Sequence, residues 1–216
     1  MKSIRDYNVY LFDFDYTLCD SGEAITMCYR HVLEKHGYEG ITDFRIQQMI
    51  GTPLYDAMVL LTGKTDPETV NQYCDEFQEY ADEVMAENTY LFPFTMDLLK
   101  ELRSMGKKIG IISTKERRHI TASFDRYEMY PYIDILIAVD DNCPPKPDPS
   151  GVLLAMERLG GTKEDTLYTG DSLIDAYAAK NAGLDFVAVT TGTTAEEEFH
   201  SVPAIAILKD ASLMLK

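Results

Sequence analysis

The sequence has few of the residues that build disulfide frameworks or zinc sites. Its four cysteines, at 19, 28, 74 and 143, are scattered and form no C-x-x-C pair. This spacing argues against a structural zinc site and against a disulfide framework. The four histidines also lack the spacing of metal ligands. Because scattered, reduced thiols are typical of cytoplasmic proteins, we expect a cytoplasmic location.

Long apolar segments and an excess of basic residues are also lacking. No apolar run approaches the length of a membrane span, and no basic region precedes an apolar stretch at the N-terminus, so we predict neither a secretory signal nor a membrane partner. The 216 residues include 20 Lys and Arg against 36 Asp and Glu, a net charge of −16. This charge repels polyanions, which argues against nucleic-acid binding. A small anionic substrate would need a local cation.

Apolar runs typical of strands alternate with amphipathic runs typical of helices. This alternation predicts an α/β fold in which helices cover both faces of a parallel sheet. Active sites in such sheets lie beyond the carboxyl ends of the strands. The strand-like runs lie at 9–12, 108–112, 133–139, 166–169, 186–190 and 204–207, and the helix-like runs lie near 95–105, 116–127, 150–159 and 173–182.

The stretch from about residue 21 to 88 interrupts the alternation. It has helical periodicity almost throughout and no convincing strand, with turn signals near Gly37, Gly51 and Gly63. An all-helical insert directly after the first strand favours a cap over the strand ends, although a helical extension that only enlarges the core is an alternative. We expect a core domain of residues 1–18 and 90–216 and a cap domain of residues 19–89.

Two aspartates, Asp13 and Asp15, directly follow the first apolar run. On a continuing strand, carboxylates two residues apart would point the same way and repel each other. A metal cation, or an anionic substrate with its metal, would make this costly arrangement useful. Two solvated aspartates at a polar strand end are the alternative.

Further strand ends and loops carry polar groups with two interpretations each. Ser113 could donate to a phosphoryl oxygen, or could cap the following helix. Lys146 lies among three prolines that would fix its direction, or it is a solvated loop lysine. Asp171 ends a strand, a natural position for a magnesium ligand. Asp175 forms a capping-box-like pair with Ser172, which is compatible with supporting a metal.

These motifs together resemble the haloacid dehalogenase superfamily. Asp13-x-Asp15-x-Thr17, Ser113, Lys146 and Gly170-Asp171 with Asp175 occur in the order of that family, and the similarity spans essentially the whole chain. The resemblance implies a Rossmann-like three-layer core with a small helical cap inserted after the first motif. Local strings at 20–21, 51–54, 146–149 and 191–197 resemble the phosphoglycolate phosphatase and pyrophosphatase branch.

Three positions depart from the family pattern. Tyr16 stands where glycine is usual, Thr114 replaces a common asparagine, and Phe94 replaces a common glycine. None of these changes removes a charged catalytic group. Tyr16 is expected to add bulk near the entrance, which puts the usual substrates of the branch in doubt more than the chemistry.

The resemblance implies a magnesium-dependent phosphatase that acts on a small phosphorylated metabolite. In such an enzyme Asp13 attacks phosphorus and forms an aspartyl-phosphate, and Asp15 transfers protons. Lys146 offsets the repulsion between carboxylate and phosphate. The magnesium ligands would be the Asp13 carboxylate, the Asp15 carbonyl and Asp171, with Asp175 as a ligand or support.

The resemblance also implies which residues bind the substrate. Ser113, Thr114 and Thr17 would bind or orient the phosphoryl group. Arg45 in the cap would read a carboxylate or second phosphate, or it is a surface arginine. The oligomeric state is expected to be a monomer or a homodimer.

Other functions remain open on the same scaffold. A sugar-phosphate phosphomutase shares every core residue, and the cap decides whether water or a second hydroxyl accepts the phosphoryl group. Dehalogenation needs neither magnesium nor the second aspartate, and phosphonate hydrolysis needs a cap lysine, for which Lys35 and Lys64 are unmarked candidates. A non-catalytic binding domain would usually lack a core residue, and this sequence lacks none.

Overall fold

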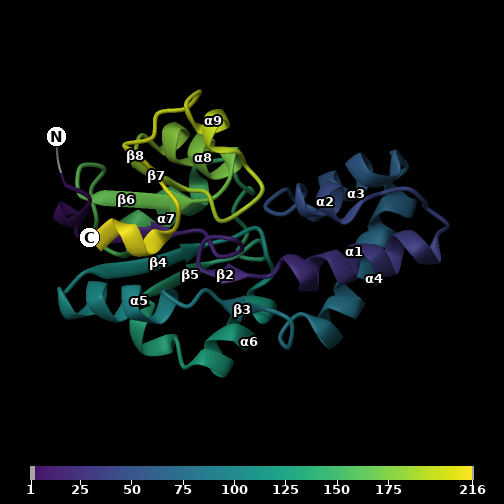
Figure 1. Cartoon of the computed structure of the whole chain (residues 1–216), viewed down its shortest axis with the longest axis horizontal. Coiled ribbons are helices and arrows are strands. Elements are labelled where there is room, and N and C mark those ends of the chain that lie inside the picture. The colour runs from purple at the N-terminus through teal and green to yellow at the C-terminus, as the bar shows by residue number, and fades with distance from the viewer. Residues whose placement is uncertain (1–2, 216) are drawn as a thin grey trace.

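The computed structural model describes residues 3–215, and its centre is a six-stranded parallel sheet. The strand order is β5-β4-β1-β6-β7-β8 (Figure 1). All four residues of β1 are buried, as expected for an apolar strand covered on both faces. The strands are β1 (Val9–Phe12), β4 (Lys108–Ile112), β5 (Ile135–Ile137), β6 (Thr166–Gly170), β7 (Asp185–Val189) and β8 (Ala206–Leu208).

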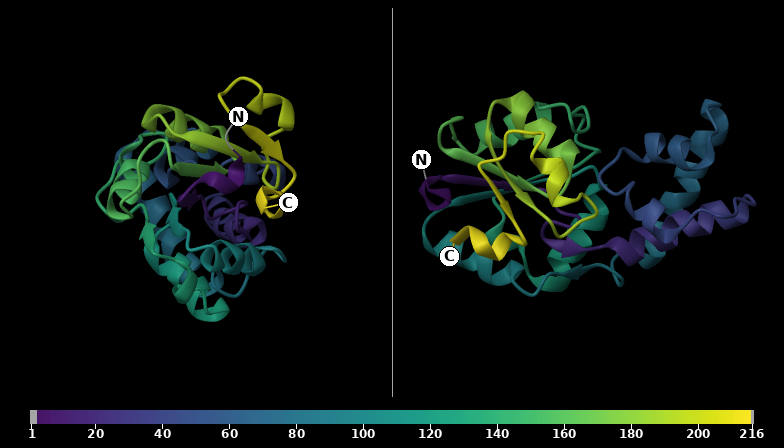
Figure 2. Two further views of the ribbon diagram at one scale, coloured as in Figure 1. Left: turned by 90° about the vertical axis from the view of Figure 1, so that its left-hand side faces the viewer. Right: turned by 45° about the horizontal axis from the view of Figure 1, so that its top comes forward.

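Helices cover both faces of this sheet and complete three layers (Figure 2). On one face, side chains of α5, α6 and the C-terminal 3-10 helix pack against the strands. On the other face, α7, α8 and α9 do so. The predicted Rossmann-like architecture is therefore confirmed. The bounds are α5 (Thr95–Ser104), α6 (Arg117–Tyr127), α7 (Ser150–Arg158), α8 (Leu173–Ala182), α9 (Glu196–Phe199) and the 3-10 helix Ala211–Leu215.

Four helices follow the first strand and lie beyond one end of the sheet (Figure 1). They share an apolar cluster of their own, in which α1 and α4 supply most of the buried side chains. The predicted all-helical cap is thus present in the fold. Its helices are α1 (Gly22–Lys35), α2 (Asp43–Gln47), α3 (Leu54–Thr62) and α4 (Pro67–Val84).

A short antiparallel ladder joins the helical segment to the sheet. It consists of β2 (Cys19–Asp20) and β3 (Tyr90–Leu91), with Cys19 opposite Leu91. Two-residue strands carry no periodicity, so the sequence pattern could not reveal them. The predicted domain boundaries at 18/19 and 89/90 fall on this ladder, and the division into two domains stays a prediction.

Several element ends differ from the sequence predictions by one or two residues. β5 is shorter than the predicted run 133–139 because the chain turns after Ala138, whose carbonyl accepts from the Asp141 amide. Helix α7 begins at Ser150, the first residue of the predicted run 150–159, and ends at Arg158. Within residues 3–215, no helix has both the length and the apolar composition needed to cross a membrane.

Candidate active site

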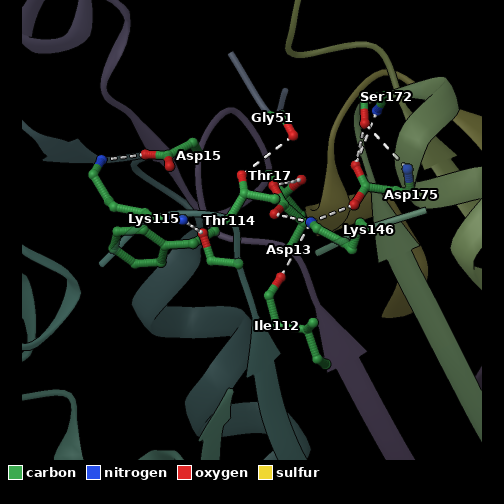
Figure 3. Close-up of polar contacts among 12 residues, drawn as sticks. Asp13, Asp15, Thr17, Gly51, Ile112, Thr114, Lys115, Lys146, Ser172 and Asp175 are labelled. Carbon is green, nitrogen blue, oxygen red and sulfur yellow. Dashed lines mark hydrogen bonds and ion pairs between the residues drawn. The ribbon is translucent and has the colours of Figure 1, made fainter. Parts of the chain in front are cut away.

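The two aspartates after β1 point in different directions. The strand ends at Phe12, and the chain then turns, with the amides of Thr17 and Leu18 donating to the Phe14 carbonyl. The Asp13 carboxylate points toward Lys146, whereas the Asp15 carboxylate points toward Lys115 (Figure 3). Because the strand does not continue through them, the expected side-by-side repulsion is relieved.

Lys146 contacts two carboxylates, Asp13 and Asp175, that lie far from it in the sequence. Its ammonium lies 2.6 Å from Asp13 Oδ1 and 2.6 Å from Asp175 Oδ1, and it donates to the Ile112 carbonyl at 3.2 Å (Figure 3). It also donates to the Tyr168 hydroxyl at 3.2 Å. The side chain is 4% exposed. A solvated loop lysine is therefore excluded, and Lys146 is the cation that an anion would meet at the strand ends.

Three buried carboxylates, from Asp13, Asp171 and Asp175, form the acidic part of the site. One oxygen of each lies within 4.8 Å of the others. Lys146 pairs with two of them, and Asp171 forms no ion pair within residues 3–215. Three carboxylates and one ammonium leave an excess of negative charge in a buried volume. Because carboxylate oxygens are the ligands that hard divalent cations prefer, the donor set fits Mg²⁺.

The pKa values at the site reflect this crowding. Burial, with the Asp175 and Asp15 carboxylates, raises the pKa of Asp13 to about 7 against the opposing effect of Lys146. Burial and the Asp13 and Asp175 carboxylates also raise the pKa of Asp171 well above its usual range. For Lys146, burial lowers the pKa, but the neighbouring carboxylates outweigh it and raise the pKa well above the ordinary value. Charged carboxylates here are costly without a second cation.

Asp175 serves both as a helix cap and as a partner of Lys146. It lies in the first turn of α8, where its Oδ2 accepts from the Ser172 amide at 3.2 Å and the Ser172 hydroxyl at 2.5 Å. The Asp175 amide donates back to the Ser172 hydroxyl, which completes the predicted capping box. Its Oδ1 accepts from Lys146 and from Tyr168. The two interpretations of Asp175 are thus compatible.

Asp15 has partners that the sequence did not single out. The Lys115 ammonium lies 2.5 Å from Asp15 Oδ1, and the Ser21 hydroxyl donates to the same oxygen at 2.6 Å. The Lys115 side chain is only 6% exposed. A lysine two residues beyond a strand-end serine was the available signal, but its partner lies 100 residues away in the chain.

The three hydroxyl residues of the prediction occupy distinct places. Ser113 is buried at the end of β4, where its hydroxyl accepts from the Lys115 amide at 3.1 Å. It does not cap α6, which begins only at Arg117. Thr17 is buried between Asp13 Oδ2 at 3.3 Å and Asp171 Oδ1 at 3.5 Å. Thr114 instead donates to the Gly51 carbonyl and joins core to cap.

Arg45 and Tyr16 lie away from the cavity beside Asp15. Arg45 is exposed on α2 and is absent from the cavity lining within residues 3–215, so its binding role stays a prediction. Tyr16 is 8% exposed and packs against Gly22 at the start of α1. Its side chain lines a different hollow, together with Asp20 and Tyr90. The bulk that Tyr16 was expected to add at the entrance therefore packs against the first residue of α1.

The loop after β7 contacts the acidic cluster through Gly192. A Cβ at Gly192 would lie 1.9 Å from Asp171 Oδ2, so only glycine leaves room for that carboxylate. The neighbouring Thr191 hydroxyl donates to the Tyr16 carbonyl. The string at 191–197 resembles the family pattern, and the close approach of Gly192 to Asp171 explains the glycine in it.

Comparisons with known proteins agree with this geometry. The family model for haloacid dehalogenase-like hydrolases matches residues 10–189. The pyrophosphatase PpaX of Bacillus velezensis is 31% identical over 173 residues, which cover 80% of this chain and 78% of that protein. A solved structure from Bacteroides fragilis, described as a haloacid dehalogenase-like hydrolase, has a TM-score of 0.94 and 44% identity, covering 96% of this chain and 99% of that chain.

A second solved structure, from Lactobacillus plantarum, is described as a phosphoglycolate phosphatase. It has a TM-score of 0.82 and 25% identity and covers 97% of each chain. The family match extends from β1 to β7 and so includes every strand end at which the site residues lie. The chain belongs to the haloacid dehalogenase-like hydrolase family.

Proposed function

We propose that the protein is a magnesium-dependent phosphatase that hydrolyses a small phosphomonoester through an aspartyl-phosphate on Asp13. The observation that carries the proposal is the convergence of Asp13, Asp171, Asp175 and Lys146 at the strand ends. A nucleophilic carboxylate, a cation-binding cluster and a buried ammonium are the groups that phosphoryl transfer requires. The names of the relatives, a pyrophosphatase and a phosphoglycolate phosphatase, are consistent with this chemistry.

Asp13 and Asp171 would hold the magnesium ion, with the Asp15 carbonyl as a further ligand and Asp175 as a ligand or support. When bound, Mg²⁺ supplies charge that offsets the repulsion between the phosphate dianion and the carboxylates. Thr17 keeps the carboxylates of Asp13 and Asp171 in place through its hydroxyl contacts to both.

In the first step an Asp13 oxygen attacks phosphorus and the bond from phosphorus to the leaving oxygen breaks. Asp15 gives its proton to that oxygen, which leaves as an alcohol. The Asp15 carboxylate faces the cavity between core and cap, and the hydrogen bonds described for it converge on Oδ1, which leaves Oδ2 to carry the proton. Lys146 holds the Asp13 carboxylate in position and offsets phosphate charge.

In the second step water attacks the phosphorus of the aspartyl-phosphate, and the bond between phosphorus and the Asp13 oxygen breaks. Asp15, now ionised, accepts the proton of the attacking water and is ready for another cycle. Inorganic phosphate leaves, and Asp13 is regenerated. Ser113, buried beside the reacting centre at the end of β4, would donate its hydroxyl hydrogen to a phosphoryl oxygen.

The cellular setting is part of the proposal. All four cysteines are free and at least partly buried, which is consistent with a cytoplasmic enzyme. The partner is a small phosphorylated metabolite.

Substitution of Asp13 tests the proposal. Asp13→Asn keeps the size of the side chain and removes the nucleophilic charge, so phosphate release in the presence of Mg²⁺ should fall by at least about 10³-fold. The exposed Asp125 on α6 provides a matched control, because Asp125→Asn makes the same change far from the strand ends. Phosphate release by Asp13→Asn at the wild-type rate would refute the role of Asp13.

A further inference from the structure

Tyr168 lies in β6, between β1 and β7, and is fully buried. Its ring belongs to the apolar cluster on the side of α7 and α8, with 6.0 Å between its centre and that of the Phe186 ring. A phenylalanine would fill this apolar space equally well and would bury no polar atom. Because a buried hydroxyl is costly unless it forms hydrogen bonds, the partners of this hydroxyl show what the tyrosine contributes.

Both partners of the Tyr168 hydroxyl are charged groups of the candidate site. Its oxygen lies 3.2 Å from Lys146 Nζ and 2.8 Å from Asp175 Oδ1. An ammonium group only donates and an ionised carboxylate only accepts, so the hydroxyl accepts from Lys146 and gives its single hydrogen to Asp175. Tyr10, a buried tyrosine on the neighbouring strand β1, donates instead to the backbone carbonyl of Ile4 at 2.7 Å.

The Lys146 ammonium has more acceptors around it than hydrogens to give. Its three N–H groups face a carboxylate oxygen of Asp13 and one of Asp175, each at 2.6 Å, and two further oxygens, of Ile112 and Tyr168, each at 3.2 Å. Among these acceptors, the Tyr168 hydroxyl is the one whose own hydrogen also reaches Asp175. The position of the ammonium therefore depends on how strongly each acceptor attracts it.

Tyr168 reduces the attraction of Asp175 for the lysine. Asp175 Oδ2 accepts from the hydroxyl and the amide of Ser172, and Oδ1 accepts from Lys146 and Tyr168, so each oxygen has two donors. Equal distances of 2.6 Å show that the ammonium is shared evenly between Asp13 and Asp175. Without the Tyr168 hydrogen, Asp175 Oδ1 would keep one donor and would draw Lys146 away from Asp13.

We propose that Tyr168 is a positioning residue, whose hydroxyl holds Lys146 where its ammonium contacts Asp13 and meets the phosphoryl group. The proposal rests on the phosphatase function proposed above, and it adds a residue that acts through Lys146 without touching the substrate. Both contacts of the hydroxyl are internal to the protein. The hydroxyl therefore stays in place while Lys146 turns an N–H group toward a phosphoryl oxygen.

Removal of this hydroxyl tests the proposal. Tyr168→Phe keeps the ring, whose centre lies 5.9 Å from Lys146 Nζ, and loses only the hydrogen bonds. With p-nitrophenyl phosphate and Mg²⁺, kcat should fall about 10-fold while KM changes less than about twofold. Tyr10→Phe is the matched control, because it also removes a hydrogen-bonded hydroxyl from a buried strand tyrosine, and its kcat should equal that of the wild type. An unchanged kcat in Tyr168→Phe, or an equal loss in both variants, would overturn the proposal.

A double-mutant cycle shows whether the hydroxyl acts through the lysine. Lys146→Met removes the ammonium, and its slow turnover can be followed at high enzyme concentration. In this background Tyr168→Phe should change kcat less than about twofold, whereas a further 10-fold loss would contradict the proposal. Absence of phosphate release by the wild-type protein with Mg²⁺ would instead overturn the phosphatase function itself.

Discussion

At the scale of single residues, the position of Asp171 in the acidic cluster depends on Gly192 having no side chain. Asp171 occupies the space that a Cβ of Gly192 would need, and it is also held by the Thr17 hydroxyl. The nearest loop thus fixes the direction of the carboxylate that has no ion pair among the described residues. This contact gives the glycine a role in positioning Asp171 that is separate from backbone flexibility.

Gly192→Ala should therefore displace Asp171 without unfolding the protein. Because small misplacements of catalytic groups are costly, kcat should fall by about 10²-fold, and the Mg²⁺ concentration needed for half-maximal activity should rise. Phosphate release across a magnesium titration measures both effects. Thr193→Ala in the same loop serves as the control. Unchanged magnesium dependence in Gly192→Ala would contradict the assignment of Asp171 as a ligand.

At the scale of elements, a contact between Tyr16 and Gly22 joins the turn after β1 to the cap. Tyr16 has a φ of 58°, in the left-handed region that L side chains rarely adopt, which explains why glycine is usual at this position. Its hydroxyl would lie 2.2 Å from a Cβ on Gly22, the first residue of α1. The unusual tyrosine and the glycine at the helix start are therefore complementary in shape.

A double-mutant cycle on this pair measures the complementarity. Alanine favours helices over glycine, yet Gly22→Ala should lower the free energy of unfolding by about 1–3 kcal/mol because its methyl group overlaps Tyr16. In a Tyr16→Gly background the same substitution should be neutral or stabilising. Chemical denaturation of the four proteins gives the coupling energy. An equal effect of Gly22→Ala in both backgrounds would refute the contact.

The elements themselves were largely predictable, because apolar runs mark buried parallel strands directly in the sequence. The polar residues at their ends, Asp13, Ser113 and Asp171, could be placed at one edge of the sheet for the same reason. The direction of each side chain beyond its strand could not be predicted. Lys115 shows this limit, since its partner Asp15 is brought to it only by the turn after β1.

At the scale of the whole molecule, a strongly acidic chain concentrates two buried lysines at its strand ends. The net charge is −16, and the side chains of Lys146 and Lys115 are 4% and 6% exposed. Lys146, the predicted local cation, contacts Asp13 and Asp175, and its role toward an anionic substrate stays a prediction. The cap contributes most of the apolar wall of the cavity beside Asp15, and the core contributes Lys115, Glu116 and His119.

The central claim is that Asp13 carries the phosphoryl group, and a trapped intermediate tests it most directly. With p-nitrophenyl phosphate the leaving group needs no proton, so Asp15→Asn should slow only the second step. We predict a burst of nitrophenolate close to one equivalent per enzyme and, after acid quenching, mass-spectrometric detection of phosphate on the peptide that contains Asp13. A burst without phosphate on Asp13, or phosphate on another residue, would contradict the account.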